Sequence, residues 1–113
     1  MTESEFLQQA EATLSQIEAT LEELANTSDL DVECTRSGNV LEIEFVDNGT
    51  KIIVNSQAPM KELWVAAKSG GFHFKAQGSK WINHRDGDAE LFAALSQMVS
   101  QQGGIDVTLH DVN

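Results

Sequence analysis

The chain of 113 residues is poor in several residue types, and each shortage excludes a class of protein. Cys34 is the only cysteine, so a disulfide-stabilised secreted scaffold is excluded. Pro59 is the only proline, and no repeat or low-complexity tract interrupts the chain, which predicts one domain over residues 1–113. Residues 1–7 carry no basic segment and no long apolar run. We therefore expect a cytoplasmic protein with no membrane partner.

Basic residues are the most informative shortage. The first 35 residues hold nine carboxylates and no Lys or Arg, and so carry −9 of the net charge of −11. Such an imbalance costs stability through repulsion, and it indicates a basic partner, a bound cation or a need for solubility. Because the few cations form no cluster in the sequence, nucleic acid and anionic membranes are excluded as expected partners.

The apolar pattern predicts a helix, a series of strands and a second helix. Leu7, Ala10, Leu14, Ile17, Leu21 and Leu24 recur at three- and four-residue steps, which predicts an amphipathic helix from Glu3 to about Leu24. Alternating patterns predict strands at residues 30–35, 40–46, 51–55, 62–68, 72–75 and 80–82, with Asn48-Gly49 forming a type I′ hairpin turn.

A second helix is expected from Ala89 to about Gln102, with N-caps offered by residues 86–88. Residues 105–109 are a candidate last strand. The order predicts an α+β fold, a two-layer α/β sandwich in which both helices pack on one face of an antiparallel sheet of five to seven strands.

The acidic residues fall into two predicted groups. At about 100° per residue, Glu11, Glu18 and Glu22 lie within roughly 40° of one another beside the apolar stripe of the first helix. In the first predicted strand, acids alternate with apolar residues and should line one face, as do Glu42 and Glu44 in the next strand. The alternating acids of the first strand are Asp29, Asp31 and Glu33.

Three sequence motifs resemble those of bacterial frataxins, the CyaY family. They are Asn55-Ser56-Gln57-Ala58-Pro59, then Glu62-Leu63-Trp64-Val65-Ala66, then Gly70-Gly71-Phe72-His73-Phe74. The similarity extends from the opening Ser4-Glu5-Phe6 to Trp81-Ile82. The chain departs from the family where paired acids are common, because Ala19 follows Glu18 and Ala25 follows Leu24.

The resemblance implies the frataxin-like sandwich and a protein of iron–sulfur cluster assembly. It implies weak, reversible iron (Fe²⁺/Fe³⁺) binding at an acidic ridge, no organic cofactor, and action as an iron chaperone, donor or iron-dependent regulator of the cysteine desulfurase. The implied metal ligands are Glu11, Glu18, Glu22, Glu23, Asp29, Asp31 and Glu33. The implied partner-binding residues, for the desulfurase and the iron–sulfur scaffold protein, are Glu18, Glu22, Asp31, Glu33, Glu44, Asn55, Gln57 and Trp64. The protein is expected to be a monomer that iron could drive to oligomerise.

The acidic residues alone are compatible with a metal site but do not establish one. Carboxylates are hard donors suited to iron and other divalent ions, and Glu18 and Glu22 at i,i+4 lie close enough to share an ion. An exposed site without imidazole or thiolate would bind weakly and select poorly, and a merely solvated acidic face remains the alternative. A Ca²⁺ loop is excluded because residues 29–33 lack its spacing and glycine.

An alternative function is a ferroxidase or iron-storage protein that oxidises ferrous iron. A buried di-iron centre uses Glu-x-x-His pairs, and no such pair occurs in the chain. His73 is expected on a strand surface and Cys34 as a buried small apolar residue, with acidic neighbours that raise its thiol pKa. The sequence therefore predicts a binding protein and no catalytic residues.

Trp64 is the strongest candidate for an exposed binding residue. Its neighbours Leu63 and Val65 occupy the inward face by alternation, which leaves Trp64 outward beside Asn55 and Gln57. Trp81 is expected in the core or at a sheet edge.

Overall fold

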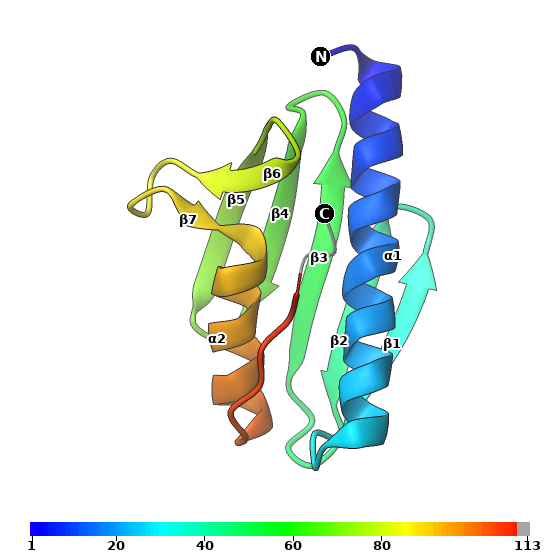
Figure 1. The fold of residues 1–113 in the computed structure, drawn as a ribbon, viewed down its shortest axis with the longest axis vertical. Coiled ribbons are helices and arrows are strands. Elements are labelled where there is room, and N and C mark those ends of the chain that lie inside the picture. The colour runs from blue at the N-terminus through cyan, green and yellow to red at the C-terminus, as the bar shows by residue number, and fades with distance from the viewer. Residues whose placement is uncertain (111–113) are drawn as a thin grey trace.

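A computed structural model describes residues 1–110 as a two-layer α+β sandwich (Figure 1). The elements follow the chain as α1 (Glu3–Thr27), β1 (Val32–Ser37), β2 (Val40–Phe45), β3 (Lys51–Gln57), β4 (Glu62–Ala67), β5 (Gly70–Gln77), β6 (Lys80–Asn83), β7 (Ala89–Glu90) and α2 (Leu91–Gly103). Both helices cover the same face of the sheet, as predicted, and the opposite face is open.

The seven strands form one antiparallel sheet in chain order, β1 to β7. Strands that follow one another in the chain are therefore also neighbours in the sheet. The register pairs Val54 with Val65 and Leu63 with Phe74, so one face is continuously apolar beneath the helices. Trp81 lies in this core with its ring edge against Phe6, at 5.7 Å between centroids and 82° between planes.

Helix α1 begins with a capping box. The Thr2 hydroxyl accepts from the Glu5 N–H (3.1 Å) and the Glu5 carboxylate accepts from the Thr2 N–H (2.8 Å). The hydroxyls of Thr27 and Ser28 donate to carbonyls of the last turn, which explains why the helix continues to Thr27, beyond the predicted end at Leu24.

The first apolar position of α1 is corrected by the structure. Phe6 is fully buried, whereas Leu7, predicted in the core stripe, is 44% exposed. The reason is that this end of the helix faces Trp81, and the Phe6 ring lies on that side.

Two further local predictions are wrong. The β2–β3 connection is longer than a two-residue type I′ turn, because only Gly49 has positive φ there and Asn48 instead donates its side-chain amide to the Gln102 carbonyl (2.7 Å). Strand β1 begins at Val32, so Asp29 and Asp31 lie in the connection that precedes it.

The second helix begins later than predicted. Ala89 and Glu90 form β7 against β6, and the Glu90 side chain caps α2 by accepting from the N–H groups of Phe92 (2.9 Å) and Ala93 (3.3 Å). Asp86 and Asp88 are therefore not the cap, because the β7 pairing carries the chain past them before the helix starts.

Residues 105–109 form no strand, contrary to the sequence prediction. The segment runs extended between α1 and α2 (Figure 1), with Val107 and Leu109 buried. Its backbone bonds to helix side chains in place of a strand. The Ser100 hydroxyl bonds both N–H and carbonyl of Val107, and the Ser96 hydroxyl accepts from the Leu109 N–H (2.8 Å).

Candidate functional site

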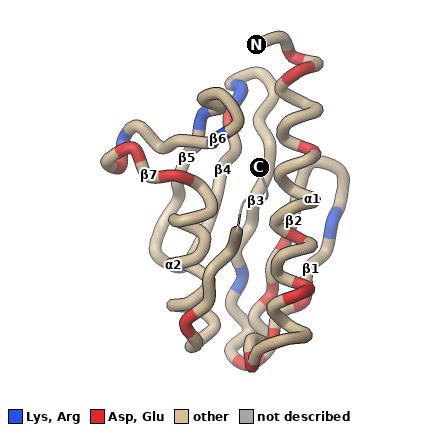
Figure 2. Tube along the Cα trace, in the orientation of Figure 1, with Lys and Arg blue, Asp and Glu red and all other residues tan. Residues whose placement is uncertain are grey.

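The outer side of α1 and the edge strand β1 together carry the densest group of acids (Figure 2). Glu18 is half-buried, and Glu22 and Glu23 are exposed. Burial, followed by the charges of Glu18 and Glu22, raises the pKa of the Cys34 thiol to about 11. These two carboxylates therefore lie close to β1, where Cys34 faces the helix.

The acids of β1 and β2 point to the opposite, open face of the sheet. Glu33 is the register partner of Glu44, and Thr35 is that of Glu42. Val32 and Cys34 alternate with these residues and face the helix layer. The acids thus occupy both sides of β1: the helix side through Glu18 and Glu22, and the open side through Glu33 and Glu44.

Asp29 and Asp31 complete the group at the end of the sheet where α1 turns into β1. Both are exposed and flank the buried Leu30, as the alternation predicts. We call the following residues the acidic surface: Glu18, Glu22, Glu23, Asp29, Asp31, Glu33 and Glu44.

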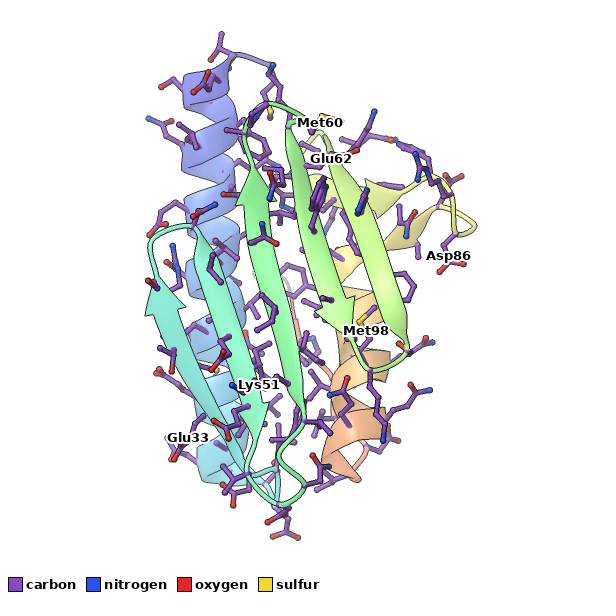
Figure 3. The ribbon with its side chains drawn as sticks, turned by 180° about the vertical axis from the view of Figure 1, so that it is seen from behind. Glu33, Lys51, Met60, Glu62, Asp86 and Met98 are labelled. Atoms are coloured by element: carbon purple, nitrogen blue, oxygen red, sulfur yellow. The ribbon has the colours of Figure 1, made fainter. Side chains whose placement is uncertain are left out.

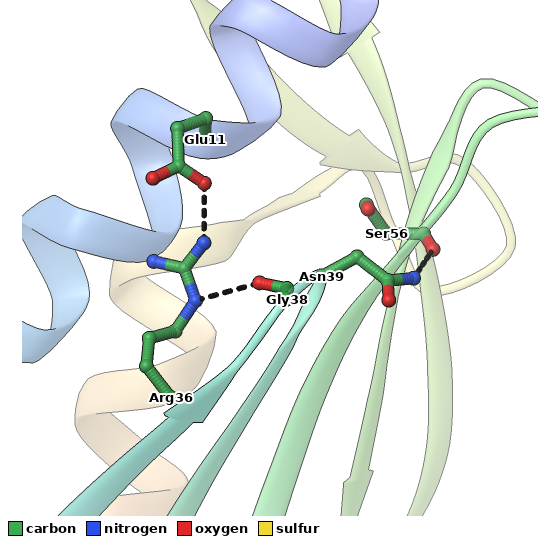
Figure 4. Close-up of polar contacts among 5 residues, drawn as sticks. All are labelled: Glu11, Arg36, Gly38, Asn39 and Ser56. Carbon is green, nitrogen blue, oxygen red and sulfur yellow. Dashed lines mark hydrogen bonds and ion pairs between the residues drawn. The ribbon is translucent and has the colours of Figure 1, made fainter.

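Glu11 differs from the other predicted ligands because it has a cationic partner. Arg36 on β1 forms an ion pair with the Glu11 carboxylate and also donates to the Gly38 carbonyl at 3.1 Å (Figure 4). The same close-up shows Asn39 donating to the Ser56 carbonyl, which joins the β1–β2 turn to β3. A cation at Glu11 would have to compete with Arg36. Glu42 is partly compensated in the same way, by Lys51 at 3.4 Å.

The acidic surface is not a preformed chelate. Among residues 1–110, no three His, Cys, Asp or Glu side chains are arranged closely enough to hold a metal ion together. A cation there would keep most of its water and contact one or two carboxylates at a time. The arrangement thus offers hard oxygen donors without the geometry that gives high affinity.

A second candidate site lies on the open face of the sheet around Trp64. The indole of Trp64 stacks on the His73 imidazole, with centroids 4.4 Å apart and planes 7° from parallel. Its N–H donates to Glu62 Oε1 at 2.9 Å, and the His73 Nδ1 lies 3.7 Å from the same oxygen. The Glu62 side chain is only 10% exposed. The indole is therefore fixed on both its face and its polar edge.

The other predicted residues of this face are brought alongside Trp64 by the register. Asn55 is the cross-strand partner of Trp64, and Gln57 is the partner of Glu62. Both are half-buried on the open face. Figure 3 shows Glu62 at one end of this face and Glu33 near the other, so the aromatic site and the acidic surface occupy different ends of the sheet.

Comparison with known proteins decides the family. The model of the frataxin-like domain matches residues 1–105. The chain belongs to the frataxin-like family.

Individual frataxin-like relatives resemble this chain in sequence or structure over most of its length. The iron-sulfur cluster assembly protein CyaY of Herminiimonas arsenicoxydans is 86% identical over 111 residues, 98% of each chain. Among solved structures, frataxin from Psychromonas ingrahamii has a TM-score of 0.86 and 33% identity, covering 98% of this chain and 100% of its own. The trimeric frataxin of the yeast Saccharomyces cerevisiae, in a complex with ferrous iron, shares the fold at a TM-score of 0.72 and 24% identity, covering 85% and 86% of the two chains.

Sequence reasoning missed two members of the frataxin-like chain's aromatic site. Glu62 and His73 surround Trp64, yet neither appears among the predicted site residues. The signal was available, because Glu62 lies two residues from Trp64 on the same strand face. The hairpin through Gly70-Gly71 also sets His73 opposite Trp64. No helix formed by residues 1–110 has the length and hydropathy needed to cross a membrane.

Proposed function

We propose that this chain acts in iron–sulfur cluster assembly as a binding protein whose acidic surface docks on a basic surface of the cysteine desulfurase. The function is supported by the relative of 86% identity that bears the name of an iron-sulfur cluster assembly protein. The observation that carries the docking mode is that Glu18, Glu22, Asp31 and Glu33 gather at one end of the molecule without cationic partners among residues 1–110. Complementary charge of this kind raises association rates and orients the partners. We place this activity in the cytoplasm and in one domain of residues 1–113.

The same acids would carry iron as cargo, weakly and reversibly. Carboxylate oxygens are hard donors, and Glu18 with Glu22 stands one helical turn apart beside the exposed acids of the α1–β1 connection. Iron bound there would neutralise part of the negative charge that attracts the basic surface of the desulfurase. Iron and the desulfurase would therefore compete for the same carboxylates, and desulfurase binding would depend on the iron concentration.

The Trp64 face serves a different partner, the iron–sulfur scaffold protein. A half-exposed tryptophan held in one orientation loses little entropy on binding, and such residues commonly anchor interfaces. Asn55 and Gln57 supply amide groups beside it. Because the two sites lie at different ends of the sheet, both partners can be held at once.

Charge reversal tests the docking surface. Glu18→Lys with Glu22→Lys should weaken desulfurase binding, measured by isothermal titration calorimetry, by more than about tenfold, because both lost attraction and new repulsion act at the interface. A control that changes net charge equally, Asp86→Lys with Asp106→Lys, alters exposed acids outside the acidic surface and should bind nearly as the natural chain does.

The wild-type affinity should also fall steeply as salt rises, since the Debye length shortens from about 10 Å at 0.1 M to about 3 Å at 1 M. Equal losses in both double variants would show that only net charge matters and would contradict docking through Glu18 and Glu22. An affinity that salt does not change would contradict electrostatic docking altogether.

A further inference from the structure

The few cations of this acidic chain are distributed unevenly, and this distribution points to a site of opposite charge. Arg36 and Lys51 each pair with a carboxylate on the acidic half of the sheet. Lys61, Lys75 and Arg85 instead lie at the turns and strands of the β4–β6 end, where Figure 2 shows basic segments close together. Several cations of this chain of net charge −11 therefore lie in one region, beside Asp86 and Asp88 of the β6–β7 connection.

Two of these cations line a groove on the open face. The groove has a volume of about 340 Å³ and runs from Trp64 and His73 past Lys75 to Ile82 and Arg85. Its volume is at the small end of ligand pockets, about 300–1,000 Å³. It therefore fits a few side chains of an extended segment, and is too small for a helix or a folded domain.

The charges in the groove are not balanced internally. Within residues 1–110, neither Lys75 nor Arg85 has a carboxylate within ion-pair distance. Glu62, the acid in the groove, already accepts the Trp64 indole N–H and is mostly buried. The His84 imidazole is held by Asp88 at 3.0 Å. The permanently charged groups left for a ligand are therefore the two cations.

Apolar surface adjoins the cations. Met60 at the groove rim is 58% exposed, Ile82 is half-buried, and the stacked indole and imidazole rings line one side of the groove. A ligand that satisfies the groove must combine an anionic group with apolar side chains. Inorganic anions meet only the first requirement.

We propose that this groove binds a short extended segment of a protein partner in which a carboxylate side chain is flanked by apolar residues. The carboxylate lies between Lys75 and Arg85, and its apolar neighbour packs on Trp64 and Ile82. Lys75 and Ile82 are cross-strand partners within the groove, and β4 has a strand on each side, so side chains supply the contacts there. The inference rests on the proposed use of the Trp64 face by a protein partner and adds the chemistry that this partner presents.

A peptide titration followed by amide and indole NMR signals of the full chain tests the proposal. The probe is a blocked hexapeptide of alternating leucine and glutamate, at 0.15 M salt so that the net negative charge of the protein is screened. Signals of Trp64, His73, Lys75 and Ile82 should shift together. The matching peptide of leucine and glutamine should bind at least about fivefold more weakly, because it lacks the charges that the two cations attract.

Two variants with the same change in net charge distinguish binding in the groove from a general effect of the protein's net charge on peptide binding. Lys75→Glu should weaken binding of the acidic peptide by about fivefold or more, whereas Lys68→Glu, on the β4–β5 turn outside the groove, should leave it nearly unchanged. Equal losses in both, equal binding of the neutral peptide, or the same shifts with inorganic phosphate alone would each overturn the proposal. Shifts that depend on protein concentration without peptide would identify a second copy as the occupant and would also overturn it.

Binding of the scaffold protein distinguishes this inference from the proposed function. If Trp64→Ala abolishes scaffold binding and Lys75→Glu does not change it, the groove inference fails and the proposed function stands. If Trp64→Ala has no effect on scaffold binding, the proposed role of this face fails, whatever the peptide does.

Discussion

Cys34 illustrates how the acidic surface acts on a single residue. Its thiol is half-buried under α1, and burial followed by the charges of Glu18 and Glu22 raises its pKa from an ordinary 9.0 to about 11. The thiolate is the reactive form, so this cysteine is unreactive near neutral pH. The sequence indicated this direction through the acidic neighbours, although the residues responsible come from α1 and not from β1.

The raised thiol pKa has a consequence for stability at high pH. Between about pH 9 and 11 the folded state keeps the proton that the unfolded state loses, so the free energy of unfolding falls as pH rises through this window. Cys34→Ala should remove this component. The measurement is urea unfolding of both chains at several pH values from 8 to 11. Parallel pH profiles for the two chains would contradict the assignment.

Gly103 shows a packing constraint at the end of α2. A Cβ at this position would lie 2.6 Å from the Leu30 side chain and 3.4 Å from Phe45, both buried. Gly103→Ala should lower stability by about 1–3 kcal/mol through overpacking. Gly71→Ala is the control, since a Cβ there meets nothing within 4 Å. Thermal unfolding of both variants checks the prediction, and an unchanged Gly103→Ala chain would show that Leu30 moves aside freely.

The elements predicted correctly are those whose pattern is local. The apolar stripe of α1 from Ala10 to Leu21, the alternation of β2 and β4 and the outward position of Trp64 follow from periodicities of 3.6 and 2, and the structure has all of them. The start of α2 was misplaced because Ala89 and Glu90 are drawn into β7 by tertiary pairing with β6. The Arg36–Glu11 ion pair could not be predicted, because it depends on how α1 crosses β1.

Residues 105–109, after α2, are held in place by hydrogen bonds to side chains and not by pairing with a strand. The Ser100 hydroxyl both donates to and accepts from the Val107 backbone (3.1 and 3.0 Å). Ser100→Ala leaves these backbone groups without that partner and should cost about 1–3 kcal/mol of unfolding free energy.

The control for this element is Ser15→Ala on the exposed side of α1, which should change stability by less than about 0.5 kcal/mol. Urea unfolding midpoints give both values. Equal effects of the two substitutions would mean that residues 105–109 add little to the fold.

On the scale of the whole molecule, charge segregation should make the free energy of unfolding depend on cations. Ferrous iron at millimolar concentration, without oxygen, should raise the melting temperature by about 4 °C when it is several times the dissociation constant, by mass action on the folded state. Sodium chloride at equal ionic strength should raise it less. Glu18→Gln with Glu22→Gln should reduce the difference between the two salts. Identical curves in iron and sodium chloride would show general screening and would contradict a site.

Strand β1 forms one edge of the sheet, and no strand within residues 1–110 lies on its outer side. An unprotected edge offers backbone groups that a second chain can pair with, which is a common route to aggregation. Glu33 and the neighbouring carboxylates make the β1 edge negatively charged. The β1 edges of two copies of the protein therefore repel each other, which disfavours pairing between them. The acids for which we propose a role in partner binding therefore also hinder self-association at this edge, and substitutions that neutralise them should lower solubility.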